Sequence, residues 1–230
     1  VPSELAQETR AVLQRLVAAG PGLPGGDARL AALWRTAFAG EPVRAGMSVV
    51  QANRAAILAL GIAVGHERLA RLAGLDRDDE LVRAAAQLRQ GATLRGREDW
   101  SRHYWLSAGL AVVESPFFSE VGGVLKEQLD AQANGSGFSF ADLAADRAGI
   151  RFAGIATRSE AQALALRARL RADFSVDDFF PAIADLPENL TAEEFKARVG
   201  SVGSPAYRQI TADIDARIDR CPGLTPRVPD

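Results

Sequence analysis

Apolar residues recur at spacings of three and four along most of this 230-residue chain, and alternating runs of β-branched residues are scarce. Spacings of three and four place side chains on one face of an α-helix. Ala, Leu and Arg, which favour helices, are abundant. The sequence therefore predicts an all-α fold, a soluble, irregular bundle of about seven to nine helices.

Capping residues and helix breakers mark where these helices begin and end. Gly20-Pro-Gly ends a first helix, and Asp27 can cap a second that runs to about residue 38. Ser48 with Gln51 forms a capping-box pattern. It opens a long helix over 49–64 that is apolar around most of its circumference, so we expect that helix at the centre of the bundle, packed with the helical segments 100–113 and 140–157.

More polar or interrupted segments follow. The sequence predicts helices over 76–90, 98–114 and 118–133, and a long helix that begins after Ser139 and runs to about residue 170. Two shorter helices begin at Thr191 and Ser204. We expect a helical core domain over 1–172 and a loop-rich extension over 173–230. That extension would pack on the core through three aromatic residues, Phe174, Phe179 and Phe180.

Composition excludes several kinds of partner and site. A net charge of −2 and a pI near 5.8 do not suit a nucleic-acid-binding protein. A single cysteine, Cys221, rules out an intrachain disulfide and any multi-cysteine metal site, and two histidines rule out a three-histidine zinc centre. Any metal cofactor would therefore be a hard divalent cation, Mg²⁺ or Ca²⁺, on carboxylate oxygens.

The hydropathy pattern predicts no transmembrane segment. The longest apolar run covers only residues 55–65, whereas a membrane-spanning helix needs about 20 residues. The chain has no visible signal peptide, but it begins at Val1 rather than Met, which is compatible with a removed leader. Association with the membrane periphery stays open, as does the oligomeric state.

Residues 99–149 carry most of the ionisable pairs at helical spacing. Asp99 and His103 lie one turn apart, and an aspartate beside an imidazole is typical of general bases and metal ligands. The alternative is that Asp99 favours the positive end of the helix dipole and His103 is a half-buried surface residue. Three neighbouring aromatic residues could wall a pocket or simply pack in the core: Trp100, Tyr104 and Trp105.

Two pairs of acidic residues follow. Glu127 and Asp130 could hold a divalent cation or perform acid–base chemistry, or they could form a solvated helix face. Asp142 and Asp146 are like charges on one helix face, which is unfavourable unless a cation lies near them. Asp142 is explained by the capping pattern, whereas Asp146 is not. We therefore expect Asp146 in the metal site, or neutralised by one of two arginines, Arg147 and Arg151.

The segment from Gly135 to Ser139 is a candidate ligand-binding turn. Two glycines, Gly135 and Gly137, precede the helix that Ser139 caps, and their backbone N–H groups could cradle an anion. The alternative is a tight interhelical turn. The Gly-Lys-Ser/Thr ending of a P-loop is absent, and Ser139 does not lie in a Gly-x-Ser-x-Gly nucleophile elbow.

Together, these motifs resemble the YfiM-like envelope lipoproteins of bacteria and, more distantly, the VanZ-like membrane proteins. The resemblance covers residues 99–149 and departs from the pattern at Trp100, where lysine is usual. The matching residues are Asp99, His103, Lys126, Glu127, Asp130, Gly135, Gly137, Ser139, Asp142, Leu143, Asp146 and Gly149. It implies a bacterial cell-envelope or periplasmic setting, with a cytoplasmic one as the alternative, and it implies no defined reaction.

Three functions compete at this point. The favoured one is a non-enzymatic envelope protein whose polar residues form a closed, hydrogen-bonded structural or binding cluster. The second is a metal-dependent hydrolase-like enzyme in which Glu127, Asp130 and Asp146 hold a cation and His103, oriented by Asp99, acts as base. In that case Asp99, His103 and Glu127 are the candidate catalytic residues. The third is a small-molecule or lipid carrier built around helix 49–64.

Overall fold

A computed structural model of the chain describes residues 3–40, 46–113 and 137–225. These ranges hold ten α-helices and three isolated β-bridges but no strand, so the predicted all-α fold is confirmed. The described helices outnumber the seven to nine that were predicted because short helices stand apart from the longer ones, for example α4 (Leu69–Leu72). None of the described helices is long and apolar enough to cross a membrane.

The first three helices begin where the capping residues predict. They are α1 (Glu4–Ala19), α2 (Gly26–Ala39) and α3 (Val49–Leu60). The Ser48 hydroxyl accepts a hydrogen bond from the Gln51 N–H at 3.1 Å and so caps α3. The predicted helix 49–64 changes character near its end, because Gly61–Gly65 forms a π-helical turn in which the His66 N–H donates to the Gly61 carbonyl at 2.7 Å.

The polar helix predicted over 76–90 is much shorter than expected. Only α5 (Glu80–Ala86) is α-helical there, and a 3₁₀ turn over Gln87–Arg89 follows it. The Asp78 N–H donates to the Asp76 side chain at 2.9 Å, and Asp79 caps α5 through the Leu81 N–H. Aspartate side chains thus hold residues 76–79 in a turn, because they compete for the N–H groups that a helix would use.

Helix α6 (Glu98–Ala111) lies between the π-helical turn and α8 (Phe140–Thr157). Glycines allow the close approach on both sides. A Cβ atom on Gly149 would overlap the Tyr104 carbonyl oxygen, and one on Gly65 would come within 2.7 Å of the Leu106 nitrogen. Helix α6 therefore packs centrally against the segments around it, as expected for residues 100–113.

The long helix predicted from Ser139 to about residue 170 is two helices. Ser139 caps α8 through the Asp142 N–H at 3.0 Å, as predicted, but α8 ends at Thr157. Ser159 then caps α9 (Glu160–Arg171) through the Gln162 N–H. The helix predicted over 118–133 lies outside the described residues.

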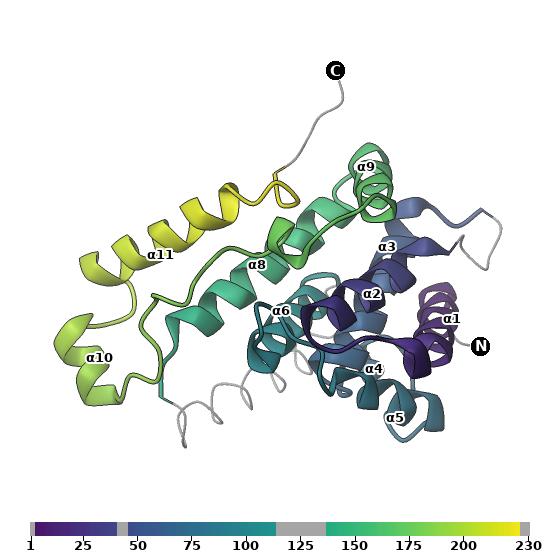
Figure 1. The fold of residues 1–230 in the computed structure, drawn as a ribbon, viewed down its shortest axis with the longest axis horizontal. Coiled ribbons are helices and arrows are strands. Elements are labelled where there is room, and N and C mark those ends of the chain that lie inside the picture. The colour runs from purple at the N-terminus through teal and green to yellow at the C-terminus, as the bar shows by residue number, and fades with distance from the viewer. Residues whose placement is uncertain (1–2, 41–45, 114–136, 226–230) are drawn as a thin grey trace.

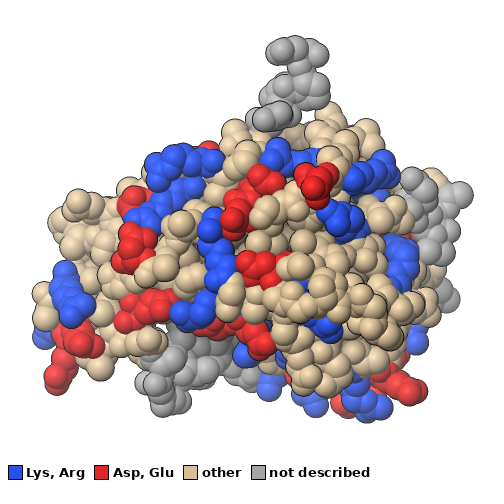
Figure 2. Space-filling model, viewed as in Figure 1, with Lys and Arg blue, Asp and Glu red and all other residues tan. Residues whose placement is uncertain are grey.

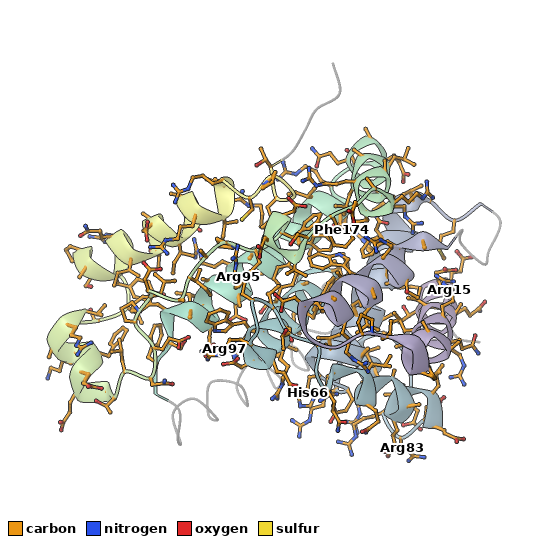
Figure 3. All side chains as sticks on the ribbon, in the orientation of Figure 1. Arg15, His66, Arg83, Arg95, Arg97 and Phe174 are labelled. Atoms are coloured by element: carbon orange, nitrogen blue, oxygen red, sulfur yellow. The ribbon has the colours of Figure 1, made fainter. Side chains whose placement is uncertain are left out.

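The C-terminal part crosses the bundle and then follows α8. After a 3₁₀ turn over Val176–Asp178 come α10 (Ala192–Arg198) and α11 (Pro205–Asp219), and α11 runs beside α8 in Figure 1. As expected, Phe179 and Phe180 are fully buried and Phe174, which Figure 3 labels, nearly so. Phe179 contacts Trp34 of α2 with ring centroids 4.9 Å apart, which fixes this segment on the helical core.

Candidate functional site

Four side chains from α6 and α8 meet at the contact between these helices. The Nδ1 atom of His103 lies 3.3 Å from Oδ1 of Asp146, and its Nε2 atom lies 3.6 Å from Oδ2 of Asp142. The Ser107 hydroxyl donates a hydrogen bond to the same Asp146 oxygen at 2.6 Å. We call these four residues, His103, Ser107, Asp142 and Asp146, the polar cluster.

Helical spacing explains how two residues from each helix reach the polar cluster. His103 and Ser107 are one turn apart on α6, and Asp142 and Asp146 are one turn apart on α8, so each pair shares a face. The missing side chain at Gly149 lets the two backbones approach closely. Ser107 was not predicted as a site residue, although its position one turn after His103 places the two side chains on the same face of α6.

When it is protonated, the His103 imidazole places a positive charge between two neighbouring carboxylates. The side chains of His103, Asp142 and Asp146 are 15%, 16% and 25% exposed, so solvent only partly screens them. Burial by itself lowers the pKa of His103, but the hydrogen bond and charge of Asp146 outweigh it, helped by Asp142 and Asp99, and the pKa is raised. Burial also raises the pKa of Asp142, and His103 partly offsets that rise.

The two predicted neutralising arginines bind elsewhere. Arg147 makes a two-pronged ion pair with Asp215 of α11, at 2.8 and 2.5 Å. Arg151 pairs with Asp219 at 2.6 Å, one turn further along both helices. The prediction that these arginines neutralise Asp146 was therefore wrong, because α11 presents its own carboxylates to them.

Asp99 has a different partner from the one predicted. Its carboxylate accepts hydrogen bonds from the Arg97 guanidinium at 2.9 and 2.5 Å. Arg97 lies beside the start of α6 in Figure 3, stacks over Trp100 at 4.7 Å and also pairs with Glu188. Asp99 thus acts on His103 through its charge, whereas the carboxylates within reach of the imidazole nitrogens come from α8.

The aromatic residues around His103 belong to the core. Tyr104 and Trp105 are fully buried, Trp100 is 3% exposed, and the first two contact Trp34 of α2 with ring centroids 5.5 and 4.9 Å away. Of the two interpretations open at the sequence level, core packing describes these residues. They form an apolar layer behind the polar cluster.

The candidate ligand-binding turn uses its backbone to hold the C-terminal segment. The Phe138 N–H donates a hydrogen bond to the Leu190 carbonyl oxygen at 2.8 Å, and the Leu190 N–H donates one to the Phe138 carbonyl oxygen. The Phe140 N–H donates a further hydrogen bond to the Pro187 carbonyl oxygen. Gly137 has a φ of +70°, and a Cβ there would come within 2.7 Å of the Leu190 carbonyl oxygen. Gly137 and Ser139 thus lie where the C-terminal segment is bonded to the start of α8, while Gly135 and the residues before it lie outside the described residues.

Two predicted metal ligands, Glu127 and Asp130, also lie outside the described residues. Among the residues that are described, no group of three or more His, Cys, Asp or Glu side chains has the geometry to hold a metal ion. Both aspartates of the polar cluster are directed to the imidazole. The described donors therefore do not fit a divalent cation by themselves, and a metal site would need Glu127 or Asp130 in addition.

The polar cluster contains serine, histidine and aspartate but lacks the connections of a catalytic triad. In a triad the serine hydroxyl donates to the histidine, which in turn donates to the aspartate. Here both Ser107 and His103 are within hydrogen-bonding distance of the same Asp146 oxygen. The Ser107 hydroxyl thus donates to the Asp146 carboxylate and not to the imidazole, so the serine–histidine hydrogen bond of a triad is not formed here.

The surface around α8 and α11 mixes the two signs of charge. On the face shown in Figure 2, basic and acidic side chains of the described residues lie interspersed, in keeping with the ion pairs of Arg147 and Arg151.

The chain was compared with protein-family models, curated proteins and solved structures, and none of the three comparisons gave a match.

Proposed function

We propose that this chain is a non-enzymatic helical protein of the bacterial cell envelope, in which the polar cluster fixes the packing of α6 on α8. The observation that carries this proposal is mutual pairing. The imidazole of His103 lies between the carboxylates of Asp142 and Asp146, and Ser107 shares the Asp146 oxygen. Partly buried polar groups that pair with one another specify one register between two helices.

The envelope setting rests on the resemblance of residues 99–149 to the YfiM-like lipoproteins. Of the residues that carry it, His103, Asp142 and Asp146 are members of the polar cluster, and Gly149 permits the helix contact. Fractionation of the native cells, with an antibody against this protein, tests the location. Recovery with the periplasmic or membrane fraction supports the envelope, whereas recovery with the cytosol supports the alternative.

A double-mutant cycle tests the packing role. His103→Gln, Asp146→Asn and the double variant should show a coupling energy of about 1–3 kcal/mol in urea unfolding, because each single change leaves a partly buried group without its partner. The matched control is the surface pair Arg151→Gln and Asp219→Asn, whose coupling should stay at about 0–1 kcal/mol. Equal coupling in the two cycles would remove the support for a structural cluster.

A metal-dependent hydrolase-like enzyme is the second candidate. The feature that favours it is the solvent access of Asp146, whose side chain is 25% exposed, next to an imidazole with carboxylate partners. In this proposal Glu127 and Asp130 complete a divalent cation site with Asp146. The cation would polarise the scissile group of the substrate, while His103 would accept a proton at one of its ring nitrogens.

A further inference from the structure

A cavity of about 300 Å³ lies between α8, α9 and the turn that follows α11, and none of its lining residues belongs to the polar cluster. Its volume is at the lower end of the range of small-molecule sites, about 300–1,000 Å³. Most of its wall is apolar, with side chains drawn from all three segments: Ile155, Ala165, Leu166 and Pro222. The consecutive helices α8 and α9 and the distant turn after α11 thus line a space suited to a small apolar group.

Two polar side chains interrupt this apolar wall. Gln162 and Arg169 both line the cavity, and they lie on the same face of α9 as Ala165 and Leu166. The Oε1 atom of Gln162 and the Nε atom of Arg169 are buried, and neither has a hydrogen-bond partner. Six other buried side-chain atoms of the described residues also lack a hydrogen-bond partner, but only these two belong to residues that line the cavity. Each such atom loses its hydration without compensation.

The surroundings of Arg169 indicate which chemistry would satisfy it. Its guanidinium lies 5.7 Å from the centre of the Phe179 ring, and one terminal nitrogen is 3.5 Å from the Asp178 carboxylate. This long ion pair leaves the Nε–H donor unused. A guanidinium presents its donors as a planar fork that matches a carboxylate. The third polar residue of the wall, Thr225, already has its hydroxyl 3.1 Å from the Asp219 and Cys221 carbonyl oxygens.

We propose that this cavity binds a small apolar carboxylic acid, of the size and kind of a medium-chain fatty acid. The hydrocarbon part lies against Ile155, Leu166 and Pro222, and the carboxylate accepts hydrogen bonds from Arg169 after a small side-chain rotation. The Gln162 amide, at the other end of the same helical face, provides a further polar contact. This site is independent of the polar cluster and of the envelope proposal.

Titration of the ¹⁵N-labelled full chain with sodium octanoate tests the site. We expect saturable chemical-shift changes centred on residues 155, 162–169 and 222–225, and weaker binding of 1-octanol and octylamine, which lack the carboxylate. Arg169→Met should weaken octanoate binding by about tenfold or more, since it removes a charge-assisted hydrogen bond. The same change should leave 1-octanol binding nearly unaltered.

A cavity-filling variant separates binding in the cavity from binding at the surface. Ala165→Leu should abolish octanoate binding, whereas Ala168→Leu, at an exposed position of the same helix, should not. Circular dichroism confirms that both variants fold. The proposal is overturned if wild-type protein shows no saturable octanoate binding, if 1-octanol binds equally well, or if Ala165→Leu or Arg169→Met binds octanoate as tightly as the wild type.

Discussion

At the scale of single residues, His103 determines the charge balance of the contact between α6 and α8. Its pKa is raised in the folded chain, chiefly because Asp146 and Asp142 outweigh the effect of burial. A raised histidine pKa means that the folded state binds a proton more tightly than the unfolded state. The stabilisation is therefore fully present below the unfolded pKa of about 6.5 and is lost as pH rises through the raised pKa of the folded state.

We therefore expect His103→Gln to lose more stability at acidic than at alkaline pH. The free energy of unfolding, measured with urea at pH 5.5 and 8.5, should differ from the wild type by about 1–3 kcal/mol at the lower pH and by clearly less at the higher one. Asp146→Asn serves as the control, because removing that carboxylate should reduce the pH dependence that His103 confers. A loss that is equal at both pH values would contradict the charge assignment.

The sequence indicated which residues share a helix face but not which residues of another helix face them. The spacing of Asp142 and Asp146 indicated that a cationic side chain would lie near them, and the sequence pointed to the nearby arginines. In the structure the ionisable imidazole of His103 lies between these carboxylates, and the arginines pair with α11 instead. Such partners depend on packing between elements distant in sequence, which single-helix periodicity does not encode.

At the scale of elements, Gly149 controls how closely α6 and α8 approach. We expect Gly149→Ala to destabilise the fold by about 2–4 kcal/mol, because the new Cβ would overlap the Tyr104 carbonyl oxygen and force the two helices apart. Gly154→Ala, on the same helix, is the matched control. Nothing lies within 4 Å of the Cβ position there, so the gain in helix propensity should stabilise the protein by about 0.5–1 kcal/mol.

Thermal and urea unfolding of the two variants measure this contrast. If Gly149→Ala were as stable as Gly154→Ala, the close contact between α6 and α8 would be wrong. The polar cluster depends on that contact, so a disrupted approach should also abolish the pH dependence expected for His103. This second readout distinguishes separation of the helices from a local change in α8 alone.

Helix starts were predicted better than helix ends. Ser48, Ser139, Thr191 and Ser204 each accept the capping hydrogen bond that their patterns indicate. The end of α8 was missed, although Ser159 with Gln162 is a similar signal, because helical periodicity continues across it. A capping residue within a periodic segment can either start a new helix or lie inside one continuous helix. Helix boundaries therefore depend on tertiary packing as well as on the local sequence.

At the scale of the whole molecule, the abundance of helix formers indicated the fold class and the apolar segments indicated the central helices, while the contacts between these helices had to come from the structure. The central position of α6 results from small residues, Gly61 and Gly65 on one side and Gly149 on the other. Glycines in a sequence indicate turns as well as close contacts. The sequence therefore predicted segments 49–64, 100–113 and 140–157 at the centre, but not the glycine contacts that bring these helices together.

Cation dependence of melting decides between the two proposed functions. If the polar cluster is a closed network, the melting temperature of the wild type should be the same in millimolar Mg²⁺, in millimolar Ca²⁺ and with chelator. A metal bound at a hundredfold excess over its dissociation constant would add about 2.7 kcal/mol and raise the melting temperature by a few degrees. Glu127→Gln would abolish that rise, whereas the control Asp219→Asn, which removes the same charge from the pair with Arg151, would retain it. We expect no rise, because the described carboxylates are directed to His103; a rise that Glu127→Gln abolishes would favour the metal-dependent enzyme.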